Sequence, residues 1–166
     1  MYFESEKRLL LQLKYLKKNF NLQGIKAEYE AEGSSYQEVS FLRRLTYKAN
    51  VPLHIKIGGV EALNDIYSCI ELGVDGIIAP MVETHYALKK FIEAKNKIFN
   101  EDEKKFTTFL INVETDQTFH NINKISEVAK NSKNEIQGYV FGRVDYSLSK
   151  EMDRDEINSD VVLNDV

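Results

Sequence analysis

Cysteine, proline and tryptophan are scarce in this chain of 166 residues, which has one cysteine, two prolines and no tryptophan. The single cysteine, Cys69, excludes an internal disulfide, and its apolar surroundings predict a small buried side chain. No apolar run is long enough to cross a bilayer, and the charged stretch that follows Met1 does not resemble a signal peptide. We therefore expect a cytoplasmic protein with no membrane partner.

An excess of charge of one sign is also missing, because 22 Lys and Arg residues face 26 Asp and Glu residues, for a net charge of −4. Nucleic-acid binding draws on clustered basic side chains, so we expect no nucleic-acid partner. The basic pairs Lys17-Lys18 and Lys89-Lys90 lie on helical stretches that also carry acids. The chain is 43% hydrophobic, which predicts one soluble domain over residues 1–166.

What the chain does have is a regular alternation of strand-like and helix-like stretches joined by short connections. Ser5 is predicted to cap a first helix, and Ser35 with Glu38 forms a capping-box pattern for a second. We expect Gly73 and Thr84 to end and begin later helices, and residues 100–105 to form a loop. The predicted strands are 25–30, 52–57, 74–82, 107–114 and 136–142. A loop around Asp145 and a short helix near Ser159 follow. This order indicates a parallel α/β sheet, either doubly wound or closed as a barrel.

The alternation of side chains within the strands favours the barrel. Ile25, Ala27 and Tyr29 would face helices, whereas Lys26, Glu28 and Glu30 would face the other side of the sheet. His54 and Lys56 alternate with Ile55 and Ile57 in the same way, and Leu110, Asn112 and Glu114 alternate with apolar neighbours. A doubly wound sheet would bury these polar residues under a second helix layer at high cost, but a barrel brings them together on its axis. A plain buried ion-pair network, with Lys26 and Lys56 neutralising Glu28 and Glu30, is the alternative.

Two carboxylates stand at the predicted ends of successive strands. Glu114 ends the strand 107–114, and Asp145 follows the strand 136–142. Acids leaving adjacent strands at one barrel rim can hold a hard cation such as Mg²⁺ or Mn²⁺, which can stabilise an enolate. The alternative is that each acid only caps a helix. Gly142 either lets the amides of Arg143, Val144 and Asp145 receive a substrate carboxylate or is an ordinary turn glycine.

Three segments together resemble one known family. Residues 74–84, with Pro80-Met81-Val82, look like the P-M-V strand of the HpcH/HpaI aldolase and citrate lyase family. Asn112-Val113-Glu114-Thr115 looks like its I-E-T/S strand end. Residues 138–147 are similar to its G-x-x-D-L-S segment, with Tyr146 where leucine is usual. The segments stand in the family's order, and the resemblance runs from about Gly24 to Ser149.

This resemblance implies a (β/α)₈ TIM-type barrel, usually oligomeric, that cleaves or joins 2-oxo acids, hydroxy acids or acyl-CoA esters. It implies that Glu114 and Asp145 are the metal ligands and that the backbone from Gly142 to Asp145 holds the substrate carboxylate. Lys56 stands where the family has an arginine, so the positive charge is kept but the planar guanidinium group that can bind a carboxylate through two hydrogen bonds is lost. Tyr29 stands where the aldolases have a histidine base, so the implied catalytic residues are Lys56 and Glu28.

Only five strands are found, whereas a closed barrel needs eight and usually ~250 residues. Aligned by its motifs, the chain lacks the family's first strand and last two strands, so we expect an incomplete barrel with exposed edges that favour homo-oligomers. The leading interpretation is a metal-dependent carbon–carbon lyase acting through a metal-stabilised enolate. The alternatives are a non-catalytic remnant that binds ligands or oligomerises, and other enolate chemistry on a phosphoenolpyruvate-like ligand.

Overall fold

The computed structural model describes residues 2–29 and 32–165. Its centre is one parallel sheet of five strands in the order β1-β2-β3-β4-β5. These strands all lie within the ranges predicted from the sequence: β1 (Ile25–Glu28), β2 (Leu53–Lys56), β3 (Gly76–Ala79), β4 (Thr108–Val113) and β5 (Gly138–Phe141). Spatial order equals chain order, so every connection crosses over one face of the sheet to the neighbouring strand.

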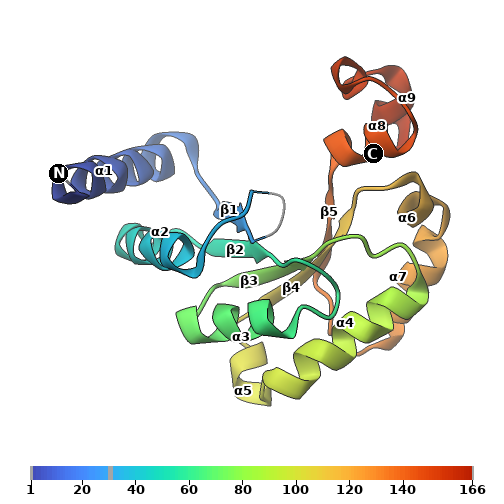
Figure 1. Ribbon diagram of the computed structural model, residues 1–166, viewed down its shortest axis with the longest axis horizontal. Coiled ribbons are helices and arrows are strands. Elements are labelled where there is room, and N and C mark those ends of the chain that lie inside the picture. Colours follow the sequence, from blue (N-terminus) through green and yellow to red (C-terminus); the bar gives the residue numbers. More distant parts are fainter. Residues whose placement is uncertain (1, 30–31, 166) are drawn as a thin grey trace.

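The helices fill the connections between the strands, and most of them lie on one side of the curved sheet (Figure 1). They are α1 (Tyr2–Phe20), α2 (Tyr36–Ala49), α3 (Leu63–Leu72), α4 (His85–Ile98), α5 (Glu101–Lys104), α6 (Asp116–His120), α7 (Ile122–Asn131), α8 (Arg143–Ser149) and α9 (Asp160–Asp165), with a 3-10 turn at Arg154–Glu156. The predicted caps at Ser35 and Gly73 are confirmed, because Ser35 and Glu38 form a capping box and Gly73 ends α3 with a left-handed φ of 61°.

Three local predictions were wrong. Ser5 does not cap the first helix, because α1 already begins at Tyr2. Residues 100–105 contain the short helix α5, whose start is a capping box between Asn100 and Glu103. A capping box of the same spacing predicted the helix after Ser35, so the start of α5 could also have been predicted from the sequence. Asp145 lies in the first turn of α8 and not in a loop.

The outer face of the sheet forms the hydrophobic core with the covering helices. Ile55, Ile77 and Ile111 are fully buried, and they pack against side chains of α2, α3, α4 and α7. Phe109 meets Phe91 and Phe99 in tilted edge contacts, with ring centroids 6.4 and 5.1 Å apart. Cys69 is also fully buried here, and burial raises the pKa of its thiol to about 12.

The inner face carries the alternate residues of the same strands, as predicted. Glu28 pairs in register with Lys56, and Lys26 pairs with His54. The ring of His54 lies over Gly76, where a Cβ atom would come within 2.2 Å of its Cδ2 atom. Glycine is therefore required at that position by the neighbouring strand and not by its own backbone. Burial lowers the pKa of His54, as expected for an imidazole that lies against the sheet.

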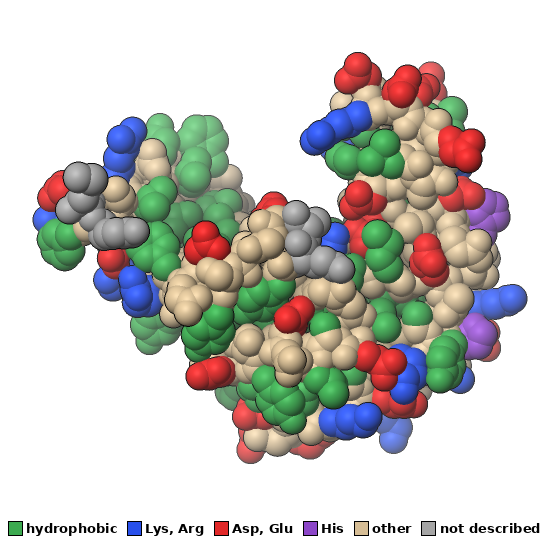
Figure 2. All heavy atoms as spheres, in the orientation of Figure 1, with side chains coloured by type: hydrophobic (Ala, Val, Ile, Leu, Met, Phe, Trp, Pro, Cys, Tyr) green, Lys and Arg blue, Asp and Glu red, His purple; other side chains and the backbone are tan. Residues whose placement is uncertain are grey.

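The sheet is an open arc and not a closed barrel. Strands β1 and β5 are its two ends and do not pair with each other in the described part of the chain. Helix α1 packs on α2 near β1, and α8 and α9 stand past the carboxyl end of β5 (Figure 1). Figure 2 shows a broad opening between α1 on one side and α8 and α9 on the other. Within residues 2–29 and 32–165, no helix is both long and apolar enough to span a membrane.

Candidate active site

Glu114 is the most completely buried carboxylate of the inner face, with 1% of its surface exposed. It follows β4 directly, and its Oε1 atom accepts a hydrogen bond from the Met81 amide at 3.0 Å. Its Oε2 atom accepts bonds from Asn112 Nδ2 at 2.6 Å and Lys56 Nζ at 3.2 Å. The capping alternative does not apply to Glu114, because Thr115 caps α6 through its own hydroxyl.

Met81 is a contact that the sequence analysis missed. Its φ is 49°, a left-handed conformation that is uncommon for a residue with a side chain. This conformation follows Pro80 and brings the Met81 amide to the Glu114 carboxylate. The Pro80-Met81-Val82 segment was interpreted as a strand and as a family motif, and no role was predicted for the Met81 amide.

Lys56 lies between two carboxylates on the inner face. Its Nζ atom is 3.2 Å from Glu114 Oε2 and 3.6 Å from Glu28 Oε2, and Lys26 Nζ is 3.1 Å from the same Glu28 oxygen. Burial disfavours the Lys56 ammonium, but Glu114, Glu28 and Asp145 outweigh it and hold the pKa of Lys56 above its ordinary value. The ion-pair network is therefore present. It includes Glu114, whereas the predicted member Glu30 lies outside the described residues.

Asp145 is exposed, in contrast to Glu114. Its charge is the weakest of the three that raise the pKa of Lys56, after Glu114 and Glu28. The glycine three residues earlier, Gly142, lies against Glu114, because a Cβ atom there would come within 2.8 Å of the Glu114 Cβ. Gly142 thus brings the segment that carries Asp145 next to the Glu114 side chain. The Gly142 amide donates a hydrogen bond to the Val113 carbonyl at 2.9 Å. The amides of Arg143, Val144 and Asp145 follow in the first turn of α8.

Tyr29 points away from this cluster. Its ring packs against the hydrophobic core on the helix side of the sheet, and burial raises its pKa. Tyr29 is therefore not placed to act in the position of the aldolase histidine. Among the acids of residues 25–29 and 32, which the structure describes, Glu28 lies on the inner face beside Lys56.

Glu114 and Asp145 are the side chains that could hold a hard divalent cation. Glu114 and Asp145 supply two carboxylates, and Mg²⁺ is commonly held by one or two carboxylates with water and substrate completing its shell. Beside Glu114, the buried Oδ1 atom of Asn112 has no hydrogen-bond partner among residues 2–29 and 32–165. Over the same residues, no group of three or more His, Cys, Asp or Glu side chains that could hold a metal ion is found. Any cation here would thus depend on ligands from outside the protein.

Comparison with known proteins identifies the relatives of this arrangement. The profile of the HpcH/HpaI aldolase/citrate lyase family matches residues 39–164. A search of curated protein sequences gave no match. Among solved structures, the citrate synthase SbnG has a TM-score of 0.75 at 15% identity over 94% of this chain. An HpcH/HpaI aldolase from Desulfitobacterium hafniense DCB-2 has a TM-score of 0.74 at 14% identity over 92% of this chain.

These solved structures are longer than the chain. It spans 65% of the length of both relatives, which agrees with the open arc of five strands. The structure is therefore a partial TIM-type barrel, as predicted from the strand pattern. Because the family profile covers most of the sequence, the chain belongs to the HpcH/HpaI aldolase/citrate lyase family.

Proposed function

We propose that the chain carries the site of a metal-dependent carbon–carbon lyase that acts on a 2-oxo acid, hydroxy acid or acyl-CoA ester. Family membership supports a lyase-type function. The observation that carries the specific proposal is the Glu114 carboxylate, which is buried on the inner face of the sheet beside Lys56 and next to the segment that carries Asp145. This is the carboxyl end of the strands, where barrels of this type keep their active sites.

Each inner-face side chain has a role in this proposal. The Lys56 ammonium would attract the negative charge that develops on the substrate oxo group, because its raised pKa keeps it protonated at neutral pH. Glu28 would serve as the general base, since it lies within 3.6 Å of Lys56 and is not one of the proposed metal ligands. The amides of Arg143, Val144 and Asp145 would receive the substrate carboxylate.

Glu114 and Asp145 would hold Mg²⁺ or Mn²⁺, and the side-chain Oδ1 atom of Asn112, which has no partner among the described residues, would accept a hydrogen bond from bound water or substrate. A bound cation of this kind would act as a Lewis acid that polarises the oxo group. Lys56 already neutralises part of the Glu114 charge, so cation binding requires the ammonium to shift toward Glu28. The substrate would then meet a single positively charged surface on the inner face.

The test is a titration of the protein with Mn²⁺ or Mg²⁺, with and without pyruvate, followed by thermal stability. We expect a rise in Tm that grows with metal concentration and that pyruvate increases. Glu114→Gln and Asp145→Asn should each lose this rise, whereas Asp155→Asn, which removes an exposed acid from the 3-10 turn, should keep it. An equal rise in all four proteins would show that the cation binds elsewhere, and the proposal would then be abandoned.

A non-catalytic, ligand-binding protein is the second candidate. The observation in its favour is that Lys56 already forms ion pairs with both Glu114 and Glu28, so the cluster is satisfied without a cation. An oxaloacetate decarboxylation assay, monitored by the loss of oxaloacetate absorbance, distinguishes the lyase from the non-catalytic protein. Metal binding with turnover above the Glu114→Gln background supports the lyase, and binding without turnover supports the second candidate.

A further inference from the structure

Tyr146 directly follows Asp145 but has the opposite environment, because it is fully buried whereas Asp145 is exposed. Its ring packs on Phe141 at the end of β5 and on Phe119 in α6, with centroids 4.9 and 5.8 Å away. The two tilted contacts fix the side of α8 that faces the sheet. Asp145 is therefore carried by a short helix whose position depends on its neighbour in the sequence.

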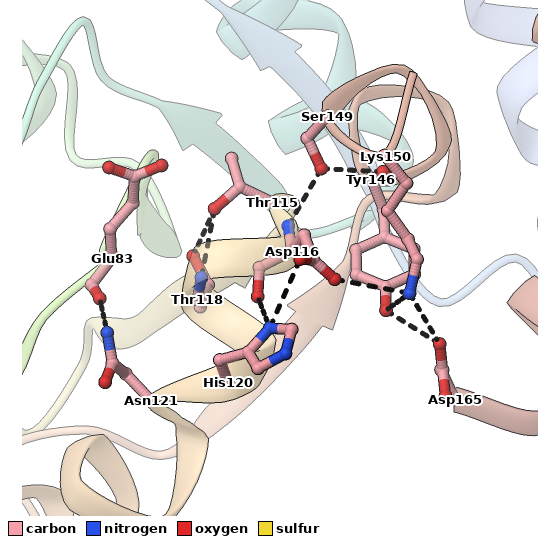
Figure 3. A network of polar contacts seen from close by, with 10 residues as sticks. All are labelled: Glu83, Thr115, Asp116, Thr118, His120, Asn121, Tyr146, Ser149, Lys150 and Asp165. Carbon is pink, nitrogen blue, oxygen red and sulfur yellow. Dashed lines mark hydrogen bonds and ion pairs between the residues drawn. The ribbon is translucent and has the colours of Figure 1, made fainter. Parts of the chain in front are cut away.

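The hydroxyl of Tyr146 extends this anchorage to the C-terminal helix (Figure 3). It donates a hydrogen bond to Asp165 Oδ2 at 2.7 Å. Lys150 Nζ lies 3.3 Å from the same hydroxyl, 3.4 Å from Asp165 Oδ2 and 3.2 Å from Asp116 Oδ1. The hydroxyl contact and Asp116 raise the pKa of Lys150, and the hydrogen bond from Tyr146 lowers the pKa of Asp165. The Lys150 ammonium thus contacts side chains from three helices, Asp116 of α6, Tyr146 of α8 and Asp165 of α9.

A second connection joins α8 to the segment that follows Glu114. The Asp116 amide, at the start of α6, donates to Ser149 Oγ at 2.8 Å, and this hydroxyl donates to the Tyr146 carbonyl at 2.7 Å (Figure 3). Asp116 is two residues beyond Glu114 in the chain. The contacts around Tyr146 therefore tie the helix that carries Asp145 to the backbone that carries Glu114.

We propose that Tyr146 is a positioning residue, whose hydroxyl holds α8 so that Asp145 and Glu114 can act on one cation. This inference rests on the proposed metal site, although the holding of α8 is measurable without it. Removing the hydroxyl leaves the ring in its packing but frees Asp165 and Lys150 from it. Tyr146 would act on the ligands through the position of α8, and the loss of groups that orient metal ligands commonly weakens metal binding about 10-fold or more.

The decisive variant is Tyr146→Phe, and its matched control is Tyr139→Phe. Tyr139 lies on β5 and is exposed, and its hydroxyl is 3.2 Å from Ser126 in α7, so the control makes the same chemical change away from α8. Two readouts are measured on each protein, the affinity for Mn²⁺ by calorimetry and the hydrogen exchange of the α8 amides by mass spectrometry. Glu114→Gln is included as the variant that lacks a ligand.

We expect Tyr146→Phe to bind Mn²⁺ about 10-fold more weakly and to exchange its α8 amides about 5-fold faster, while Tyr139→Phe matches the parent in both. Asp165→Asn should shift both readouts in the same direction as Tyr146→Phe. Unchanged exchange in Tyr146→Phe overturns the inference, as does faster exchange with unchanged Mn²⁺ affinity. If the parent protein binds no Mn²⁺, the proposed metal site is wrong. The exchange rates of the α8 amides then test by themselves whether the Tyr146 hydroxyl holds α8 in place.

Discussion

The two faces of the sheet are both largely buried but carry different kinds of side chain. On the outer face, Ile55 and Ile77 are fully buried against the helices, and the buried Lys95 of α4 lies over the Phe109 ring and is paired with Glu135. On the inner face, Lys56 and Glu28 are buried as well, with 6% and 7% of their surface exposed, and their side chains form an ion pair of 3.6 Å. The outer face is stabilised by apolar area removed from water, and the inner face by pairing of charges.

This difference teaches which face a mutation will affect. Truncation on the outer face leaves a cavity that the packed helices close only in part. Truncation on the inner face leaves an uncompensated charge, whose cost disappears when the partner is also removed. Stability and chemistry are thus separated by the period of two of a β-strand.

The largest effect is expected for Phe91→Ala on the outer face. Phe91 is fully buried and contacts Phe109, so its removal should lower the free energy of unfolding by about 3–5 kcal/mol. The measurement is urea denaturation followed by circular dichroism. Tyr86→Ala, which truncates an exposed aromatic residue on the same helix, should change stability by about 0.5 kcal/mol or less. Equal effects of the two variants would contradict the assignment of the core.

On the inner face, Glu114→Gln should lower the free energy of unfolding by about 2–3 kcal/mol, because Lys56 stays buried with only Glu28 as a charged partner. The double variant Lys56→Met/Glu114→Gln should recover most of this loss, since neither charge remains. A double-mutant cycle in urea measures the coupling. Additive losses would show that the pair is not a unit.

Gly76→Ala tests the contact between neighbouring strands. The new methyl group would overlap the His54 ring, which must move, at a cost of about 1–2 kcal/mol in unfolding free energy. His54→Ala/Gly76→Ala should be more stable than Gly76→Ala alone, because the ring that causes the overlap is gone. If His54→Ala fails to relieve the loss, the cost arises from the backbone of β3.

The smallest effect is in the pH dependence of Lys56. Its pKa is raised in the folded state, so its pairing stabilises the protein at neutral pH and this contribution is lost as the pH rises through the raised pKa, above the ordinary value of 10.5. The stability difference between the parent and Lys56→Met should therefore be constant from pH 7 to 9 and change only above that value. A change centred near pH 7 would show that another group controls the cluster.

The sequence predicted the five strands and their sidedness because alternation of apolar and charged residues is a local pattern. It predicted the caps at Ser35 and Thr84 for the same reason, since both depend on residues three apart. It failed for Ser5, because α1 continues through that position, and for Asn100, where the capping box was overlooked among polar residues. Glu114 and Asp145 were identified as a pair, and their metal binding remains a prediction.

The amino-acid sequence alone determined a parallel α/β sheet with charged residues on one face, because side-chain direction in a strand is fixed by the backbone. Only the tertiary structure decided which charges meet. Lys56 and Glu114 are 58 residues apart, and their contact depends on the order and register of β2, β3 and β4. The same holds for Gly142 against Glu114 and for Tyr146 against Asp165, since no local pattern encodes the approach of distant segments.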